Sequence, residues 1–292
     1  MDQDNISFII VHKGNSYYLP MCLKQLLYTN PNSPVYVIGT EDQKFSLDIQ
    51  HFNYFDFYSS AEQFVKIYKH FSTNSHNYEL FCFLRWFIIR DFVIKKNIDK
   101  FICLDSDVLL FENINKTHLN FYNLDLTVNN KNGPQYSFFT KDSIVDFTDF
   151  IMDYYTNKIS ILEKKYEEYK TKNKYGGICD MTLLEMFSNK HNIRFYDTSI
   201  EKNNFTFNST FYSTNKILLL KKKYSLPFYF KENGEKIFFY ALHFQGSSKM
   251  LMHRFCTYKM SFNDLLLKFK REIIYIIFSA KKYIKKLIRK DS

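Results

Sequence analysis

The chain has 292 residues, 46% of them hydrophobic, so it can bury a large core, and one α/β catalytic domain with an appendage is the expected organisation. Its five cysteines are odd in number, scattered and without metal-type spacing, which predicts buried thiols in a reducing compartment rather than a disulfide framework. The acidic N-terminus lacks the basic flank of a signal peptide, and no apolar run approaches the roughly 18 residues of a membrane span. We therefore expect a cytoplasmic protein. Its formal charge of +10 suggests an anionic partner, and most of that charge lies in residues 268–292.

Strand-like and helix-like segments alternate along the first two thirds of the chain. A strand at Ile6–His12, a helix near Leu19–Tyr28 and a strand at Val35–Gly39 have the βαβ rhythm of a mostly parallel sheet. Tyr78–Lys96 is apolar almost all round, which predicts a buried helix leading into the strand at Phe101–Leu104. The other expected elements are a helix at Asp142–Tyr155 and strands at Leu124–Val128, Tyr136–Thr140, Arg194–Tyr196, Lys216–Leu220 and Ile237–His243.

The triplet Asp105-Ser106-Asp107 interrupts an apolar stretch made of Phe101–Leu104 and Val108–Phe111. On an extended backbone, residues two apart point the same way, so the two carboxylates can converge on one object. Burying two unpaired carboxylates side by side is costly, and a divalent cation would offset that cost. A D-x-D triplet alone is a weak signal, but α/β sheets bind ligands at the carboxyl ends of strands. Carboxylate oxygens suit Mg²⁺ or Mn²⁺.

A second motif, His243-Phe-Gln-Gly246-Ser-Ser-Lys249, follows the apolar run 237–242. An imidazole at a strand end can be a third metal ligand, Gly246 would let the backbone approach a phosphate, and Lys249 supplies a cation. Taken alone, His243 is better explained as a hydrogen-bonded core histidine. The two motifs together strengthen the interpretation as a metal site.

An apolar strand ending in D-x-D, with a later strand ending in H-x-x-G-x-x-K, resembles the nucleotide-sugar glycosyltransferases of GT-A fold. The resemblance is strongest to the retaining family-eight group, which includes bacterial lipo-oligosaccharide galactosyltransferases and glycogenin. It implies an α/β, Rossmann-like domain over residues 1–258, with a mixed, mostly parallel sheet flanked by helices.

The same resemblance implies the ligands of the site. Asp105, Asp107 and His243 would hold Mn²⁺ (or Mg²⁺), while Gly246 and Lys249 would contact the diphosphate of a UDP-linked sugar donor. These roles come from the family pattern and are carried over to the matching positions of this chain.

Two further residues, Arg85 and Asp180, are candidate catalytic residues. Arg85 lies on the nearly all-apolar helix, where a guanidinium needs an anionic partner, either a carboxylate such as Asp105 or the sugar nucleotide. The family's corresponding arginine implies a site role in which Arg85 and Asp105 also contact the donor. Asp180 can be the N-cap of a helix, or the family's aspartate that binds donor sugar hydroxyls near the reacting carbon. The acids of residues 40–42 (Thr-Glu-Asp) could meet a ribose, although ordinary loop acids explain them better.

Residues 259–292 form a basic amphipathic tail. Apolar residues recur at helical spacing, and lysines and arginines lie mostly off that line. The apolar positions are Phe269, Ile273, Ile277, Ala280, Ile284 and Ile288, and the basic ones are Lys281, Lys282, Lys285, Lys286 and Arg289. This pattern favours a helix lying on an anionic membrane surface over nucleic-acid binding, and over packing of the apolar stripe on the catalytic domain.

We therefore expect a metal-dependent glycosyltransferase, peripheral on the inner face of the cell membrane, that acts in polysaccharide biosynthesis. It would move a sugar from a nucleotide diphosphate donor to a hydroxyl of a cell-surface glycan of lipo-oligosaccharide or capsule type, with retention of configuration. The acceptor would be a glycan or lipid-linked glycan, and no nucleic acid is expected as a partner. The alternatives are a D-x-D nucleotidyltransferase or nuclease, and a catalytically inactive glycan-binding protein of the same fold.

Overall fold

The computed structural model divides the chain into two units. The described residues are 6–39, 49–116, 121–129, 133–190, 192–207, 210–211, 221–223 and 226–288. The first unit comprises Met1–Asn15, Asn32–Ser106 and Asn113–Ile200, and the second comprises Ser16–Pro31, Asp107–Glu112 and Glu201–Ser292. The chain therefore passes from the first unit to the second inside the D-x-D triplet, between Ser106 and Asp107.

A seven-stranded sheet lies at the centre of the first unit, in the order β3-β2-β1-β4-β7-β6-β8. Its strands are β1 (Ser7–His12), β2 (Val35–Gly39), β3 (Gln50–Asn53), β4 (Lys100–Leu104), β6 (Leu126–Val128), β7 (Tyr136–Thr140) and β8 (Phe195–Asp197). The neighbours among β1, β2, β3 and β4 pair in parallel, β8 is parallel to β6, and β7 is antiparallel to both β4 and β6. The predicted mixed, mostly parallel sheet is confirmed. Strand β1 reads as a continuous apolar run because successive residues, which point to opposite faces of the sheet, are all buried or nearly so.

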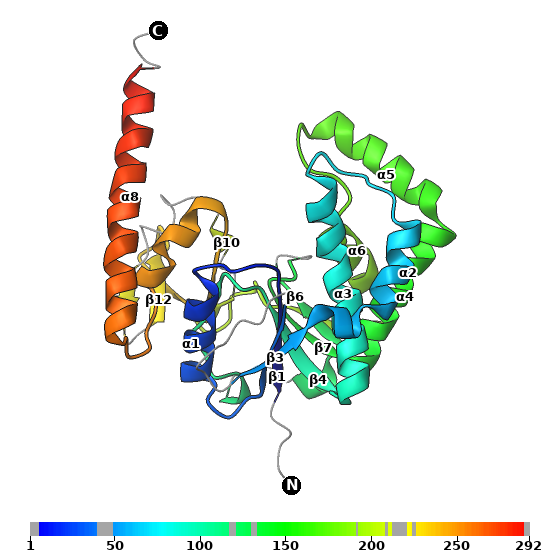
Figure 1. The fold of residues 1–292 in the computed structure, drawn as a ribbon, viewed down its shortest axis with the longest axis horizontal. Helices are drawn as coiled ribbons and strands as arrows, with labels where there is room; N and C mark the ends of the chain where they lie inside the picture. The colour runs from blue at the N-terminus through cyan, green and yellow to red at the C-terminus, as the bar shows by residue number, and fades with distance from the viewer. Residues whose placement is uncertain are drawn as a thin grey trace. The chain divides into compact units, whose positions relative to one another are not determined.

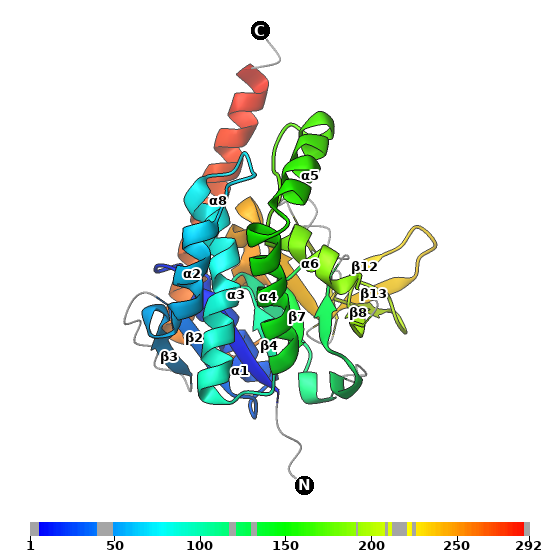
Figure 2. The ribbon, with the colours of Figure 1, turned by 90° about the vertical axis from the view of Figure 1, so that its right-hand side faces the viewer.

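Helices cover this sheet, and Figure 2 shows α3 and α4 lying over it. The helices are α2 (Ser59–Ile67), α3 (His76–Lys96), α4 (Lys141–Thr156), α5 (Ile159–Lys172) and α6 (Asp180–Ser188), with short 3₁₀ turns η1 (Tyr54–Phe57), η2 (Ile114–Lys116) and η3 (Phe121–Asn123). Helix α3 is apolar almost all round because it packs between α2 and α4, as the sequence predicts. Its Phe83, Phe87 and Phe92 are fully buried, and burying each phenylalanine stabilises the fold by about 1.5–3 kcal/mol.

In its described residues, the second unit holds two smaller sheets and three helices. The sheets have the orders β10-β14-β5 and β11-β12-β13-β9. The strands are β5 (Val108–Leu110), β9 (Phe205–Thr206), β10 (Thr210–Phe211), β11 (Lys221–Lys223), β12 (Leu226–Phe230), β13 (Lys236–Phe239) and β14 (Ala241–Phe244), and the helices are α1 (Leu19–Thr29), η4 (Gly246–Arg254) and α8 (Phe262–Ile288). Figure 1 shows α8 in red and orange as the longest helix of this unit, running beside η4.

The structure corrects one expected strand and adds two elements that the sequence did not predict. The expected strand Ile237–His243 is in fact two strands, because β13 pairs with β12 and β9 whereas β14 pairs with β5 and β10. Strand β3 and helix α2 were not expected from the sequence. The expected strand Lys216–Leu220 lies outside the described residues.

Among the described residues, no helix is both long and apolar enough to cross a bilayer. Helix α8 is long enough, but acidic and basic side chains occur along it.

Candidate metal and diphosphate site

Asp107, His243 and Lys249 meet in the second unit. Strands β5 and β14 are antiparallel, with His243 opposite Val108, so the residue just before β5 lies beside the imidazole. His243 Nε2 is 3.2 Å from Asp107 Oδ1, and Lys249 Nζ is 2.9 Å from Asp107 Oδ2. The backbone carbonyl oxygen of Asp107 also accepts a hydrogen bond from the Phe244 backbone N–H at 2.9 Å. The sequence predicted these three residues as one site, and the structure brings them together.

The charges in this cluster favour ionised partners. Burial alone would raise the pKa of Asp107, but hydrogen bonds and charges from His243 and Lys249 outweigh it and lower the pKa to about 2. Burial would lower the pKa of Lys249, and the Asp107 carboxylate raises it overall. At neutral pH the pair is therefore a carboxylate beside an ammonium, which suits a site for a metal ion and an anionic ligand.

Gly246 lets the chain turn from β14 into the 3₁₀ helix η4. Its φ of +54° lies in the left-handed region, which glycine adopts without strain. The turn places Lys249 three residues further on, within the same short helix. The glycine therefore sets the turn that leads to the lysine.

The D-x-D triplet and His243 supply a potential set of three ligands for a divalent ion: Asp105, Asp107 and His243. Asp105 is covalently tied to Asp107 through Ser106, whose hydroxyl lies 2.9 Å from His12 Nδ1. Two carboxylates and an imidazole fit Mn²⁺ or Mg²⁺, and three protein ligands leave coordination positions for water or phosphate oxygens. The donor set therefore agrees with the expected cofactor in type.

Arg85, Trp86, Asp105 and Asp180 form a second cluster, in the first unit. The Arg85 guanidinium donates to Asp105 at 2.8 Å and to Asp180 at 2.7 Å, and stacks 4.8 Å from the centroid of the Trp86 ring. The Trp86 indole N–H donates to Asp180 at 3.0 Å. Burial opposes the charge of Arg85, but Asp180 and Asp105 raise its pKa overall. In this cluster one arginine forms ion pairs with two aspartates.

Asp180 is not an N-cap, so that interpretation of the sequence is wrong. Helix α6 begins at Asp180, and the N-cap position belongs to Cys179, which pairs with Thr182 in a capping box. The Asp180 side chain, 4% exposed, is used by Arg85 and Trp86 instead. The acids of residues 40–42 lie outside the described residues.

Two aromatic residues of the site were not assigned from the sequence. Trp86 is the single tryptophan of the chain and directly follows Arg85. That position beside a candidate catalytic arginine could have indicated from the sequence that Trp86 belongs to the site. Tyr18 lies under the ammonium of Lys249, with 4.7 Å between Nζ and the ring centroid. Its sequence context, just before α1, gave no sign of this contact.

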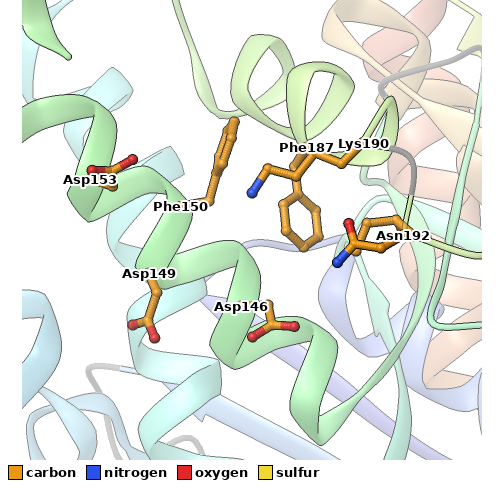
Figure 3. A pocket seen from close by; sticks show the side chains of 8 residues that line it. Asp146, Asp149, Phe150, Asp153, Phe187, Lys190 and Asn192 are labelled. Carbon is orange, nitrogen blue, oxygen red and sulfur yellow. The ribbon is translucent and has the colours of Figure 1, made fainter.

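A separate pocket of about 330 Å³ lies between α4 and the end of α6 (Figure 3). Its lining combines acidic side chains of α4 with Phe187 and Lys190 on the opposite wall. Lys190 Nζ lies 4.4 Å from the centroid of the Phe150 ring. None of the residues predicted to carry the chemistry lines this pocket.

No protein-family model matches the sequence, and no curated protein matches it. Among solved structures, the chain is similar to the apo form of mouse xyloside xylosyltransferase 1, with 12% identity and a TM-score of 0.47 over 66% of this chain and 84% of that one. It is similar to an active-site mutant of LgtC, with 14% identity and a TM-score of 0.38 over 75% of this chain and 79% of that one. A cytidylyltransferase from Leptospira borgpetersenii serovar Hardjo-bovis is a further neighbour, with 13% identity and a TM-score of 0.32 over 56% of this chain and 73% of that one.

Proposed function

We propose that the chain is a metal-dependent glycosyltransferase of GT-A type that transfers a sugar from a nucleotide diphosphate donor to a hydroxyl group of a glycan. The observation that carries this proposal is the Asp107 carboxylate held between the His243 imidazole and the Lys249 ammonium at the end of the D-x-D triplet. Such a reaction must release a nucleoside diphosphate, and the negative charge that grows on it needs cations close by.

The site residues divide this task between them. Asp105, Asp107 and His243 would hold Mn²⁺ or Mg²⁺, which when bound supplies Lewis-acid stabilisation of the departing diphosphate. Lys249 adds a fixed positive charge on the same side, and Gly246 lets backbone N–H groups come close to a phosphate. The donor would be UDP-linked.

Arg85 and Asp180 would act on the donor sugar. Asp180 is held by two donors, so its carboxylate has a fixed orientation in which it can accept hydrogen bonds from sugar hydroxyls. With retention of configuration, an oxygen of the departing phosphate takes the acceptor proton and no separate base is needed. With inversion, Asp180 is the base. The stereochemistry of the product, read by NMR, decides between the two.

The acceptor would be a lipid-linked or cell-surface glycan reached at an anionic membrane surface. Helix α8 turns an apolar face to solvent, with Phe269, Ile273 and Ile276 between 42% and 65% exposed. One acidic residue of α8 is turned toward η4: Glu272 accepts from Arg254 at 2.7 Å and lies 2.8 Å from His253. An exposed apolar stripe followed by a lysine-rich end suits the boundary between lipid head groups and acyl chains.

The experiment is a thermal denaturation screen of the purified protein with Mn²⁺ and a panel of nucleotide sugars. A ligand at 100 times its Kd should add about 2.7 kcal/mol to the stability. We expect a UDP-sugar to stabilise the protein and to be hydrolysed slowly, and Asp107→Asn or His243→Ala to abolish both effects. Asp146→Asn, on the surface of α4, is the matched control. Consumption of nucleoside triphosphates, or unchanged Mn²⁺ affinity in His243→Ala, would instead favour the nucleotidyltransferase alternative.

A further inference from the structure

The first half of α8 is joined to the candidate diphosphate site by a chain of side-chain contacts within the second unit. The Arg271 guanidinium lies 3.5 Å from the centroid of the Tyr17 ring. Tyr17 packs edge to face on Tyr18, with 5.3 Å between the ring centroids. Tyr18 in turn lies under the ammonium of Lys249 at 4.7 Å. Four consecutive contacts, ending with the pair between Lys249 and Asp107, therefore link α8 to the metal ligands.

Other contacts hold this half of α8 in place. Lys24 of α1 donates to Asp264 at 2.6 Å, which fixes the start of the helix. One turn past Lys268, Glu272 pairs with Arg254 and His253, both on η4, the 3₁₀ helix that also carries Lys249. Helix α8 is thereby attached both to α1, which follows Tyr17 and Tyr18, and to η4, which carries Lys249.

The guanidinium of Arg271 lies against the face of the Tyr17 ring. Its Nε is buried and has no hydrogen-bond partner among the residues that the structure describes. The main partner of this guanidinium is the face of the Tyr17 ring, a contact that stabilises by about 1–2 kcal/mol when partly shielded from water. Removing the guanidinium would leave the Tyr17 ring unsupported on that side.

Lys249 needs such support because a lysine side chain is long and flexible. Its ammonium is a compact point charge on four rotatable carbons, and a single ion pair leaves it several conformations. Contacts with both the Tyr18 ring and the Asp107 carboxylate restrict the conformations open to the ammonium. Loss of either contact would cost part of the electrostatic preorganisation on which charge stabilisation depends.

We propose that Arg271, Tyr17 and Tyr18 are positioning residues that hold Lys249 in place for the donor diphosphate, so that the first half of α8 is part of the donor site. The inference rests on the proposed function. It assigns the side of α8 that carries Arg271 to the diphosphate site and leaves the exposed apolar face of the same helix available to a lipid surface.

The test uses the full-length protein and the Kd of inorganic pyrophosphate in the presence of saturating Mn²⁺, measured by calorimetry. Arg271→Ala should weaken pyrophosphate binding by roughly tenfold, since about 1.4 kcal/mol corresponds to a factor of ten. Arg271→Lys keeps a cation above the ring and should recover most of the affinity. Lys270→Ala removes the same charge from the exposed neighbouring position and should leave the Kd unchanged.

A double-mutant cycle separates positioning from a merely structural role. If Arg271 acts through Lys249, Arg271→Ala should have no further effect on pyrophosphate binding once Lys249→Ala is present. Additive losses, or equal affinities for Arg271→Ala and Lys270→Ala, would overturn the inference while leaving the proposed function intact. Should Arg271→Ala fail to fold by circular dichroism, Tyr17→Phe and Tyr17→Ala replace it, with only the latter expected to weaken binding. A wild-type protein that binds neither pyrophosphate nor any nucleoside diphosphate would overturn the proposed function itself.

Discussion

Trp86 donates its indole N–H to Asp180 at 3.0 Å, across 94 residues of sequence. The same carboxylate oxygen accepts from Arg85, which precedes the tryptophan on α3. Adjacent residues of one buried helix therefore fix the orientation of an aspartate on another helix. This relationship makes α3 both the centre of the hydrophobic core and the support of a candidate catalytic carboxylate.

Trp86→Phe should therefore reduce both stability and activity. The change removes a hydrogen bond to a charged group and some buried volume, with a combined cost of about 2–4 kcal/mol measured by urea denaturation. Donor hydrolysis should fall as well, because Asp180 loses one of its two fixed donors. Phe87→Leu is the control, since it opens space on the same helix without a contact to Asp180. Equal activity in the two variants would contradict this account.

Gly246→Ala tests the turn that leads to Lys249. The left-handed backbone at φ +54° costs a residue with a Cβ about 1–2 kcal/mol, and relaxation of that strain would shift η4. We expect lower stability together with weaker binding of Mn²⁺ and pyrophosphate. Gly234→Ala introduces the same kind of strain at φ +82° in the turn between β12 and β13, so it should lower stability alone.

Glu272 predicts a specific loss of stability in acid. Hydrogen bonds from Arg254 lower its pKa from 4.5 to about 2 against the opposing effect of burial, with a further contribution from His253. Because the folded-state pKa lies below the unfolded value, the stabilisation is complete above about pH 4.5 and is lost as the pH falls towards 2. Glu272→Gln should remove this part of the pH dependence of the unfolding free energy.

His253 must be separated from Glu272 in that experiment. Burial lowers the pKa of His253 overall. The folded state therefore loses stability through this residue as the pH falls below 6.5, a range that lies above the one in which Glu272 acts. Curves for the wild type and Glu272→Gln that stay parallel between pH 4.5 and 2.5 would show that the carboxylate does not carry the effect.

Ile273→Glu combined with Ile277→Glu tests the exposed face of α8. Both isoleucines are at least 42% exposed, so the folded protein should keep its stability within about 0.5 kcal/mol. Association with vesicles that contain phosphatidylserine should drop at least tenfold in a flotation assay, because charge is placed where acyl chains would lie. Val65→Glu, at an exposed apolar position on α2, is the control, and unchanged flotation of the double variant would refute membrane contact through this face.

The sequence was informative where a pattern is local. Continuous apolar residues identified β1, β4 and α3, and the acids at the end of Phe101–Leu104 pointed to a ligand site before any geometry was known. The strand β3, with the residues Gln-His-Phe-Asn, has no such pattern and forms because β2 offers it a parallel neighbour.

Long-range pairing could not be predicted. The apolar run 237–242 contains no glycine or proline, yet it splits at Tyr240, because the two halves find partners in different sheets. The contact between Tyr18 and Lys249 likewise depends on the turn at η4 and on the docking of α8, neither of which leaves a local signal.

The outward apolar face of α8 also has a practical consequence for handling the protein. We expect a row of exposed isoleucine, leucine and phenylalanine side chains in aqueous buffer to pair with the same row on another molecule as the concentration rises. A mild detergent supplies a micelle for that face and should return the sample to single molecules.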